Sequence, residues 1–184
     1  MQVLETAIAD VKLIEPRKFT DDRGFFSETY NARALAEAGI DLPFVQDNHA
    51  LSLHAGVVRG LHYQSPPYAQ AKLVRVVRGA ILDVAVDLRR SSPTFARHVM
   101  VELSAENWRQ LLVPAGFAHA YLTLAPQTEV VYKVSEYYSP QHDRGVVWND
   151  PQLAIPWPVA ADQARLSEKD RRLPRLADAG PLFP

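Results

Sequence analysis

The sequence contains no cysteine among its 184 residues. This absence excludes disulfide frameworks, thiolate nucleophiles and metal sites built on cysteine. An excess of either charge is also missing, since 20 basic and 21 acidic residues leave a formal net charge of -1. Such a balance creates no broad positive field for nucleic acid or an anionic membrane, so we expect neither as a partner. Any anion that the protein binds must be held by a few local groups.

No segment has the pattern of a membrane helix or a signal peptide. Residues 111–128 carry no Asp, Glu, Lys or Arg, but Pro114, Gly116 and Pro126 would break a helix of the length that a bilayer requires. Residues 1–11 include Glu5 and Asp10 and lack the basic and apolar regions of a signal peptide. We therefore expect a cytoplasmic location.

The chain has the length of one domain with a full core. A domain of 184 residues buries about 70% of the surface that its unfolded chain exposes. Hydrophobic residues make up 47% of the sequence and charged residues 22%, which argues against disordered, collagen-like and coiled-coil chains. Neither a repeat nor a second compositional region is present, so the sequence predicts a single domain over residues 1–184.

Alternating hydrophobicity indicates an all-β fold. The 14 prolines and 8 glycines divide the chain into short segments, and these follow period 2 more often than 3.6. In residues 81–88 every second residue from Leu82 is apolar, while Asp83 and Asp87 lie on the other face, which we expect to be wet. Further strands are predicted at residues 44–53, 56–64, 72–78, 98–103, 108–113, 118–124 and 129–137.

Two short helices are expected at the periphery. Residues 31–38 form the better candidate, with Asn31 as the N-cap and Gly39 at the C-terminal end. Ser167 could cap one helical turn near the end of the chain. Many short strands in one domain leave a sandwich, a jelly roll or a small barrel as the architecture.

Two histidines stand in segments rich in polar and glycine residues. His62 belongs to residues 56–64, where alternation places Gly60, His62 and Gln64 on one face and Arg59 on the other. His119 follows a proline and glycine turn at residues 114–118. A histidine on a strand is more often structural than catalytic, so the pattern alone leaves both roles open.

The two histidine segments resemble the signatures of cupins. The spacing G-x-x-H followed by P-x-G-x-x-H resembles these double-stranded β-helix jelly rolls, which commonly hold a metal on three histidines and a glutamate. Here Gln64 stands where a second histidine is usual, and Lys72 falls where the acidic ligand is expected. An ammonium group would repel a metal ion. We expect a cupin-type jelly-roll barrel with no metal.

A closer resemblance extends over nearly the whole chain. Several ordered segments at matching separations closely resemble the dTDP-4-dehydrorhamnose 3,5-epimerase family. They are residues 22–28, 46–48, 56–64, 92–95, 114–119, 132–133, 148–151 and 166–170. The resemblance implies a cofactor-free homodimer that converts dTDP-4-keto-6-deoxy-D-glucose to dTDP-4-keto-L-rhamnose. Two departures are Ala50-Leu51 in place of a Ser-Arg pair and Ala120-Tyr121 in place of Gly-Phe, and both could reshape the pocket wall.

Epimerisation beside a ketone requires three side-chain roles. A C4 ketone acidifies the protons on C3 and C5, and the reaction needs a base, a group that stabilises the enolate oxygen, and an acid on the opposite face. His62 suits the base because imidazole titrates near neutral pH. By resemblance, Asp170 is the carboxylate that orients it. Lys72 suits the enolate oxygen, and Tyr132 can return a proton from the far side.

The resemblance also implies a set of substrate-binding residues. Arg23, Arg59 and Lys169 are expected to hold the diphosphate, for which arginine offers a bidentate fork. Tyr138 would provide a flat face for the thymine ring. The remaining expected contacts to thymine, sugar or phosphate come from Glu28, Gln46, Asn48, Lys72, His119 and Asp143.

Three alternatives stay open at this point. The first is an epimerase that acts at only C3 or C5, or on another 4-keto deoxysugar nucleotide. The second is a metal-dependent cupin, which the broken ligand spacing disfavours. The third is a jelly roll that binds sugar without catalysis, for which the combination of His62, Tyr132 and Asp170 would be an unneeded coincidence.

We further expect a homodimer from the sequence. The apolar strands before Arg23 have no obvious partner within one barrel. An unpaired strand edge favours pairing with a second chain.

Overall fold

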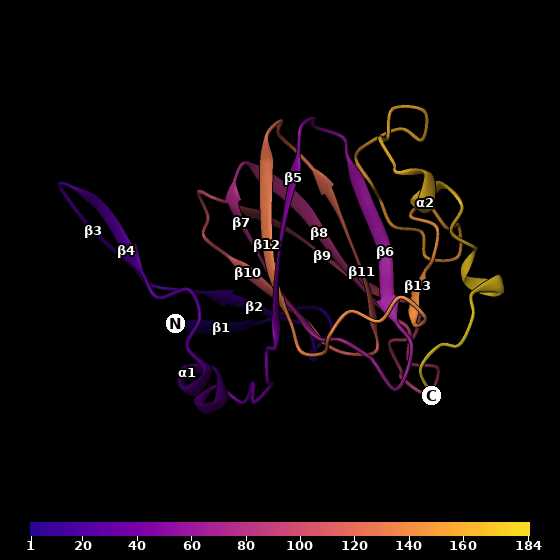
Figure 1. The fold of residues 1–184 in the computed structure, drawn as a ribbon, viewed down its shortest axis with the longest axis horizontal. Helices are drawn as coiled ribbons and strands as arrows, with labels where there is room; N and C mark the ends of the chain where they lie inside the picture. Colours follow the sequence, from indigo (N-terminus) through magenta and orange to yellow (C-terminus); the bar gives the residue numbers. More distant parts are fainter.

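The computed structural model describes all 184 residues and contains two large antiparallel sheets with a separate hairpin beside them (Figure 1). The six-stranded sheet has the order β1 (Gln2–Glu5), β2 (Lys12–Glu15), β10 (Gln110–Val113), β7 (Lys72–Arg78), β12 (Thr128–Val134) and β5 (Gln46–Ser52). The five-stranded sheet has the order β13 (Asp143–Gly145), β6 (Val58–Gln64), β11 (Phe117–Thr123), β8 (Ala80–Asp87) and β9 (His98–Ser104). The expected all-β, jelly-roll fold class is confirmed.

The main hydrophobic core fills the space between the two sheets. Val74 and Val130 from the six-stranded sheet pack in one cluster with Ala85, Leu103 and Tyr121 from the five-stranded sheet. A second cluster lies on the outer side of the five-stranded sheet, beneath the segment that follows β13. The five-stranded sheet is therefore covered on both faces.

Strand β8 shows the consequence of this double covering. Val84 and Val86 pack in the outer cluster with Phe183 of the C-terminal segment. Asp83 and Asp87 point the other way, into the sandwich, and both are 0% exposed. The prediction that these aspartates lie on a wet face is wrong, because the C-terminal segment covers the apolar face while both carboxylates have hydrogen-bond partners inside the sandwich.

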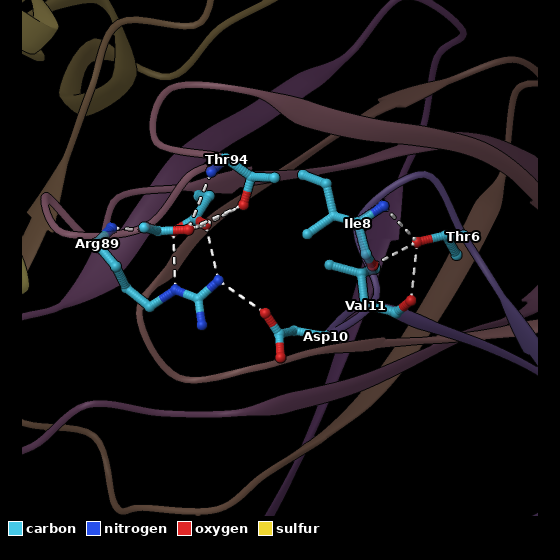
Figure 2. A network of polar contacts seen from close by, with 8 residues as sticks. Thr6, Ile8, Asp10, Val11, Arg89 and Thr94 are labelled. Atoms are coloured by element: carbon cyan, nitrogen blue, oxygen red, sulfur yellow. Dashed lines mark hydrogen bonds and ion pairs between the residues drawn. The ribbon is translucent and has the colours of Figure 1, made fainter.

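Asp87 has a complete set of such partners. Its carboxylate accepts hydrogen bonds from Nε of Arg89 at 2.9 Å, Oγ of Ser92 at 2.6 Å and Oγ1 of Thr94 at 2.6 Å. Arg89 also reaches Oδ2 of Asp10 at 2.8 Å, as Figure 2 shows. The network ties the end of β8 to the loop between β1 and β2.

Both expected helices are confirmed. Helix α1 (Ala32–Glu37) begins after Asn31, whose Oδ1 accepts a hydrogen bond from the backbone N–H of Ala34 at 3.1 Å. Helix α2 (Glu168–Arg171) begins after Ser167, whose Oγ accepts from the N–H of Asp170 at 3.1 Å. A short 3-10 helix, η1 (Leu176–Asp178), follows it. None of these helices has the length and apolarity needed to cross a membrane.

Some strand ends differ from their predicted positions. β10 begins at Gln110 because Trp108 takes a left-handed conformation, with φ of 61°, and interrupts the extended chain. β12 ends at Val134, and the residues after it form the loop that carries Tyr138.

The N-terminal strands find partners within the chain. β1 pairs with β2, and β2 pairs with β10 of the six-stranded sheet, so the expectation that they lack a partner is wrong. The strands β3 (Lys18–Asp21) and β4 (Gly24–Ser27) pair only with each other. Figure 1 shows this hairpin projecting away from the two sheets.

Candidate active site

A cavity of about 510 Å³ lies inside the sandwich and is bounded by strands of both sheets and by residues 165–170. A second hollow of about 300 Å³ borders it. His62, Lys72, Tyr132 and Lys169 line both spaces. The two spaces therefore adjoin and form one candidate site.

His62 and Asp170 form a hydrogen-bonded pair in the cavity. The distance from Nε2 of His62 to Oδ1 of Asp170 is 2.6 Å, and Asp170 is buried. Burial acts to raise the pKa of Asp170, but the hydrogen bond and the charge of His62, together with the donor Ser167, lower it on balance. Asp170 is thus an ionised acceptor that can orient the imidazole and stabilise its protonated form.

A bulge in β6 places Arg59 in the same cavity as His62. His62 pairs with His119, but Arg59 pairs with Tyr121. β6 therefore contains one residue more than β11 between these two pairs. The predicted alternation, with Arg59 on the opposite face, is wrong for this reason. Gly60 permits the bulge, since its φ is 114° and a Cβ atom there would lie 2.5 Å from the carbonyl oxygen of His119.

Lys72 and Tyr132 come from the opposite sheet. Lys72 begins β7 and is only 9% exposed. Burial lowers the pKa of its ammonium group to about 8, although Asp83 and Asp143 act to raise it. Burial also raises the pKa of Tyr132, so this phenol keeps its proton at neutral pH and remains a donor.

His119 is a buried side chain with a carboxylate partner. Its Nε2 lies 2.6 Å from Oδ1 of Asp83, and the ring borders the cavity. Burial lowers the pKa of His119 more than the neighbouring Asp83 raises it, so the ring is neutral at pH 7.

The second hollow gathers most of the remaining predicted contacts. The hydroxyl of Tyr138 donates to Oδ2 of Asp143 at 2.9 Å, and Lys169 donates to the same oxygen. Gln46 accepts from the backbone N–H of Tyr138 at 3.3 Å and donates to Asn48 at 2.9 Å. These five residues lie together at the rim, as the predicted binding roles require.

Two predicted binding residues lie elsewhere in the chain. Arg23 is at the turn of the β3–β4 hairpin, where its side chain is 86% exposed and pairs with Asp21. Glu28 accepts a hydrogen bond from Asn31 beside α1. Neither side chain lines the cavity of its own chain.

Gln64 occupies the position where metal cupins commonly carry a second histidine. Its amide donates to the carbonyl oxygens of Tyr68 at 2.7 Å and Tyr137 at 3.1 Å, and it accepts from the N–H of Ser139 at 2.7 Å. Gln64 therefore joins two loops at the rim. Nowhere in the chain do three or more His, Asp or Glu side chains gather in an arrangement suited to a metal ion.

Several residues of the cavity were not predicted from the sequence. His54 and Arg165 line it from segments without a recognisable motif. Asp83, the partner of His119, was assigned to the wrong face. Asp83 and Asp87 share one face of the strand, and alternation alone does not show whether that face is wet or buried.

Comparison with known proteins gives one family. The family model described as dTDP-4-dehydrorhamnose 3,5-epimerase matches residues 5–178. A relative of that name from Pseudomonas aeruginosa is 54% identical over 180 residues, which cover 97% of this chain and 98% of the relative.

Solved structures agree with this result. A dTDP-4-dehydrorhamnose 3,5-epimerase from Bacillus anthracis, with TDP and PPi bound, is 58% identical with a TM-score of 0.92, covering 95% of this chain and 99% of that one. An epimerase from Legionella pneumophila in complex with dTDP-4-keto-L-rhamnose is 45% identical with a TM-score of 0.91, covering 96% and 93%. This chain therefore belongs to the dTDP-4-dehydrorhamnose 3,5-epimerase family and is an epimerase of nucleotide sugars.

Proposed function

We propose that this chain inverts C3 and C5 of dTDP-4-keto-6-deoxy-D-glucose, with His62 as the base, Tyr132 as the acid and Lys72 as the group that stabilises the enolate. One observation carries the proposal. His62 stands on β6 of the five-stranded sheet, Tyr132 stands on β12 of the six-stranded sheet, and both line one cavity. A base and an acid on opposite walls are what inversion of a carbon centre requires.

The protons and charges can be followed through each half of the reaction. His62 takes the proton from the carbon beside the ketone, and Asp170 stabilises the imidazolium that forms. The electron pair of the broken C–H bond moves to the ketone oxygen, where the Lys72 ammonium stabilises the negative charge. Tyr132 then gives its proton to the carbon from the other face and recovers one from His62 or solvent. No electrons are gained or lost, and we propose that no cofactor is needed.

The same geometry supports the binding roles. Arg59 and Lys169 border the cavity as two cations that a diphosphate can bridge. Tyr138, Gln46, Asn48 and Asp143 form the rim, which suits the thymine end. His119 offers its free ring nitrogen to a sugar hydroxyl.

We further propose a homodimer in which the β3–β4 hairpin serves the neighbouring copy. The hairpin exposes Phe19, Phe25 and Phe26, and large apolar side chains on a projecting element favour contact with another chain. Arg23 at its turn would then contribute to the partner's cavity, with Glu28 at the base of the same arm.

Complementation tests this arrangement. Arg23→Ala and His62→Ala should each be nearly inactive alone. Mixed dimers formed after unfolding and refolding together should regain activity, because one of their two cavities has both an intact His62 and an intact Arg23 from the other chain. No recovery, or a monomer in sedimentation, would contradict the arrangement.

The reaction itself is tested in deuterated water with dTDP-4-keto-6-deoxyglucose. Incorporation of deuterium at both C3 and C5, with formation of the L-rhamno product, supports the proposal. Label at one carbon supports the single-site alternative, and no label supports a sugar-binding protein. Loss of activity after treatment with a metal chelator would support the metal-dependent alternative.

We also propose a cytoplasmic location, which the absence of cysteine fits. Cell fractionation tests it, and recovery from the periplasmic or secreted fraction would contradict it.

A further inference from the structure

Gln64 is a buried side chain at the end of β6 whose carboxamide binds only backbone groups. It is 4% exposed. Its Nε2 donates to the carbonyl oxygens of Tyr68 at 2.7 Å and Tyr137 at 3.1 Å, and its Oε1 accepts from the N–H of Ser139 at 2.7 Å. Two acceptors and one donor fit the amide in only one orientation. A buried polar group whose partners are all present makes the segments that supply them rigid.

Two of these contacts lie on either side of Tyr138. The carbonyl of Tyr137 and the N–H of Ser139 belong to the two peptide groups that flank the α-carbon of Tyr138. Neither Tyr137 nor Tyr138 takes part in a backbone–backbone hydrogen bond. The N–H of Tyr138 donates instead to Oε1 of Gln46 at 3.3 Å. Side chains therefore hold the backbone at Tyr138, and Gln64 supplies the contacts on both sides of it.

The side chain of Tyr138 stands at the rim of the candidate site. Tyr138 is 56% exposed and borders the second hollow. Its hydroxyl donates to Asp143, which is the residue that pairs with Gln64 between β13 and β6. An exposed ring on a loop loses conformational freedom when it stacks on a planar ligand, so a loop that is already ordered raises the affinity.

We propose that Gln64 is a positioning residue for the nucleotide: it holds the backbone on both sides of Tyr138, so that the ring is already in place when a planar base binds. This inference rests on the binding role proposed above for Tyr138. The carboxamide of Gln64 is committed to the two loops, so it acts through Tyr138. The position that commonly supplies a metal ligand in cupins here orders a loop.

The test is Gln64→Met, which keeps an unbranched side chain of similar length and removes all three hydrogen bonds. Exchange of the Ser139 N–H with solvent, followed by NMR, should quicken because this amide loses its acceptor. Calorimetric titration should show dTDP binding about tenfold more weakly. KM should rise while kcat changes little, because the carboxamide of Gln64 contacts no catalytic side chain.

A double-mutant cycle shows whether Gln64 acts through the ring. Tyr138→Ala should itself weaken dTDP binding. Adding Gln64→Met to Tyr138→Ala should cause little further loss, because no ring remains to be positioned.

The outcomes of the cycle separate the inference from the proposed function. Parental affinity in Gln64→Met, or an equal loss from Gln64→Met with and without the ring, overturns the inference and leaves the role of Tyr138 standing. If Tyr138→Ala binds dTDP as tightly as the parent, the proposed binding role of Tyr138 is wrong and the inference falls with it.

Thr6→Val is the matched control. The hydroxyl of Thr6 also lies within hydrogen-bonding distance of three backbone groups, which belong to Ile8 and Val11 in the loop between β1 and β2 (Figure 2). Thr6 lines neither space of the candidate site. Thr6→Val should lower the free energy of unfolding and leave dTDP binding as in the parent. An equal loss of dTDP affinity in Thr6→Val would mean that general destabilisation explains the effect of Gln64→Met, and would overturn the inference.

A second variant applies if Gln64→Met does not fold. Gln64→Glu keeps an oxygen that accepts from Ser139, but an ionised carboxylate cannot donate to the carbonyl oxygens of Tyr68 and Tyr137. The affinity for dTDP should again fall, and unchanged affinity overturns the inference.

Discussion

Oδ1 of Asp170 lies 2.6 Å from Nε2 of His62, although the two residues are 108 positions apart in the chain. The imidazole is held by a strand inside the sandwich, and the carboxylate is held by a single helical turn in the C-terminal segment. The proposed base therefore depends on the contact between two separate parts of the fold.

Replacing His62 by alanine should remove both exchange and inversion. A general base contributes about 10²–10⁴-fold, and the loss in His62→Ala should be at least of that size. Binding of dTDP should be largely retained, because Arg59 and the rim are untouched. Near-normal turnover, measured by conversion of dTDP-4-keto-6-deoxyglucose, would remove His62 from its role.

Tyr132→Phe should separate the rate of hydrogen exchange with solvent from the rate of inversion. His62 can still remove a proton and return it from its own side, so exchange of substrate hydrogen with solvent should continue. Inversion needs the donor on the other sheet and should slow by about 10²-fold. NMR in deuterated water measures both rates in one sample. If the variant epimerises at the parental rate, another group or water delivers the proton.

Ser167→Ala should weaken the support of Asp170. Loss of an N-cap hydrogen bond costs about 1 kcal/mol of helix stability. Because α2 has only four residues, we expect this loss to disturb the position of Asp170. We expect kcat to fall by about fivefold, as 1 kcal/mol on the barrier implies. Ser167→Asn, which can still cap the turn, should be closer to the parent. Equal impairment of both variants would show that the hydroxyl acts in the cavity rather than as a cap.

The Asp87 network predicts a specific loss of stability in acid. Burial acts to raise the pKa of Asp87, but hydrogen bonds from Arg89, Ser92 and Thr94 outweigh it and hold the pKa well below its usual value of about 3.9. Because the pKa of Asp87 is lower in the native state than in the unfolded chain, the ionised carboxylate stabilises the native state. This contribution to the free energy of unfolding is fully present above the unfolded-state pKa and is lost as the pH falls below about 4. Denaturant unfolding at pH 7 and pH 3 measures the loss.

The variant Asp87→Asn isolates this contribution. It should lower the free energy of unfolding at neutral pH by about 1–3 kcal/mol, since the amide nitrogen cannot accept the donors that the carboxylate accepts. The difference between variant and parent should shrink towards pH 3. A difference that stays constant with pH would mean that Asp87 keeps an ordinary pKa in the native state.

Local patterns were sufficient for much of the fold. Alternation located the central strands, and capping residues located both helices, because each of these signals resides in neighbouring residues. The bulge at Gly60 was beyond such reasoning, since the extra residue in β6 is defined only against β11. The buried face of β8 was missed for a related reason: its apolar residues are covered by a segment that begins some sixty positions later.

The site, unlike the strands and helices, was predicted mainly from the family resemblance and not from local patterns. The residues lining the cavity came mainly from the family resemblance, and the structure places His62, Lys72, Tyr132 and Asp170 around one space. Arg23 and Glu28 show the limit of reasoning about one chain, since both lie away from the cavity of their own chain.

The position of Asp170 has a consequence for biosynthesis. His62 leaves the ribosome more than a hundred residues before its partner carboxylate. The strands of the sandwich could pair while the last segment is still in the exit tunnel, yet His62 would lack the anion that holds its ring. The proposed base is thus complete only after translation has passed residue 170 and the C-terminal segment has closed over the five-stranded sheet, where Leu176 and Phe183 also complete the outer hydrophobic cluster.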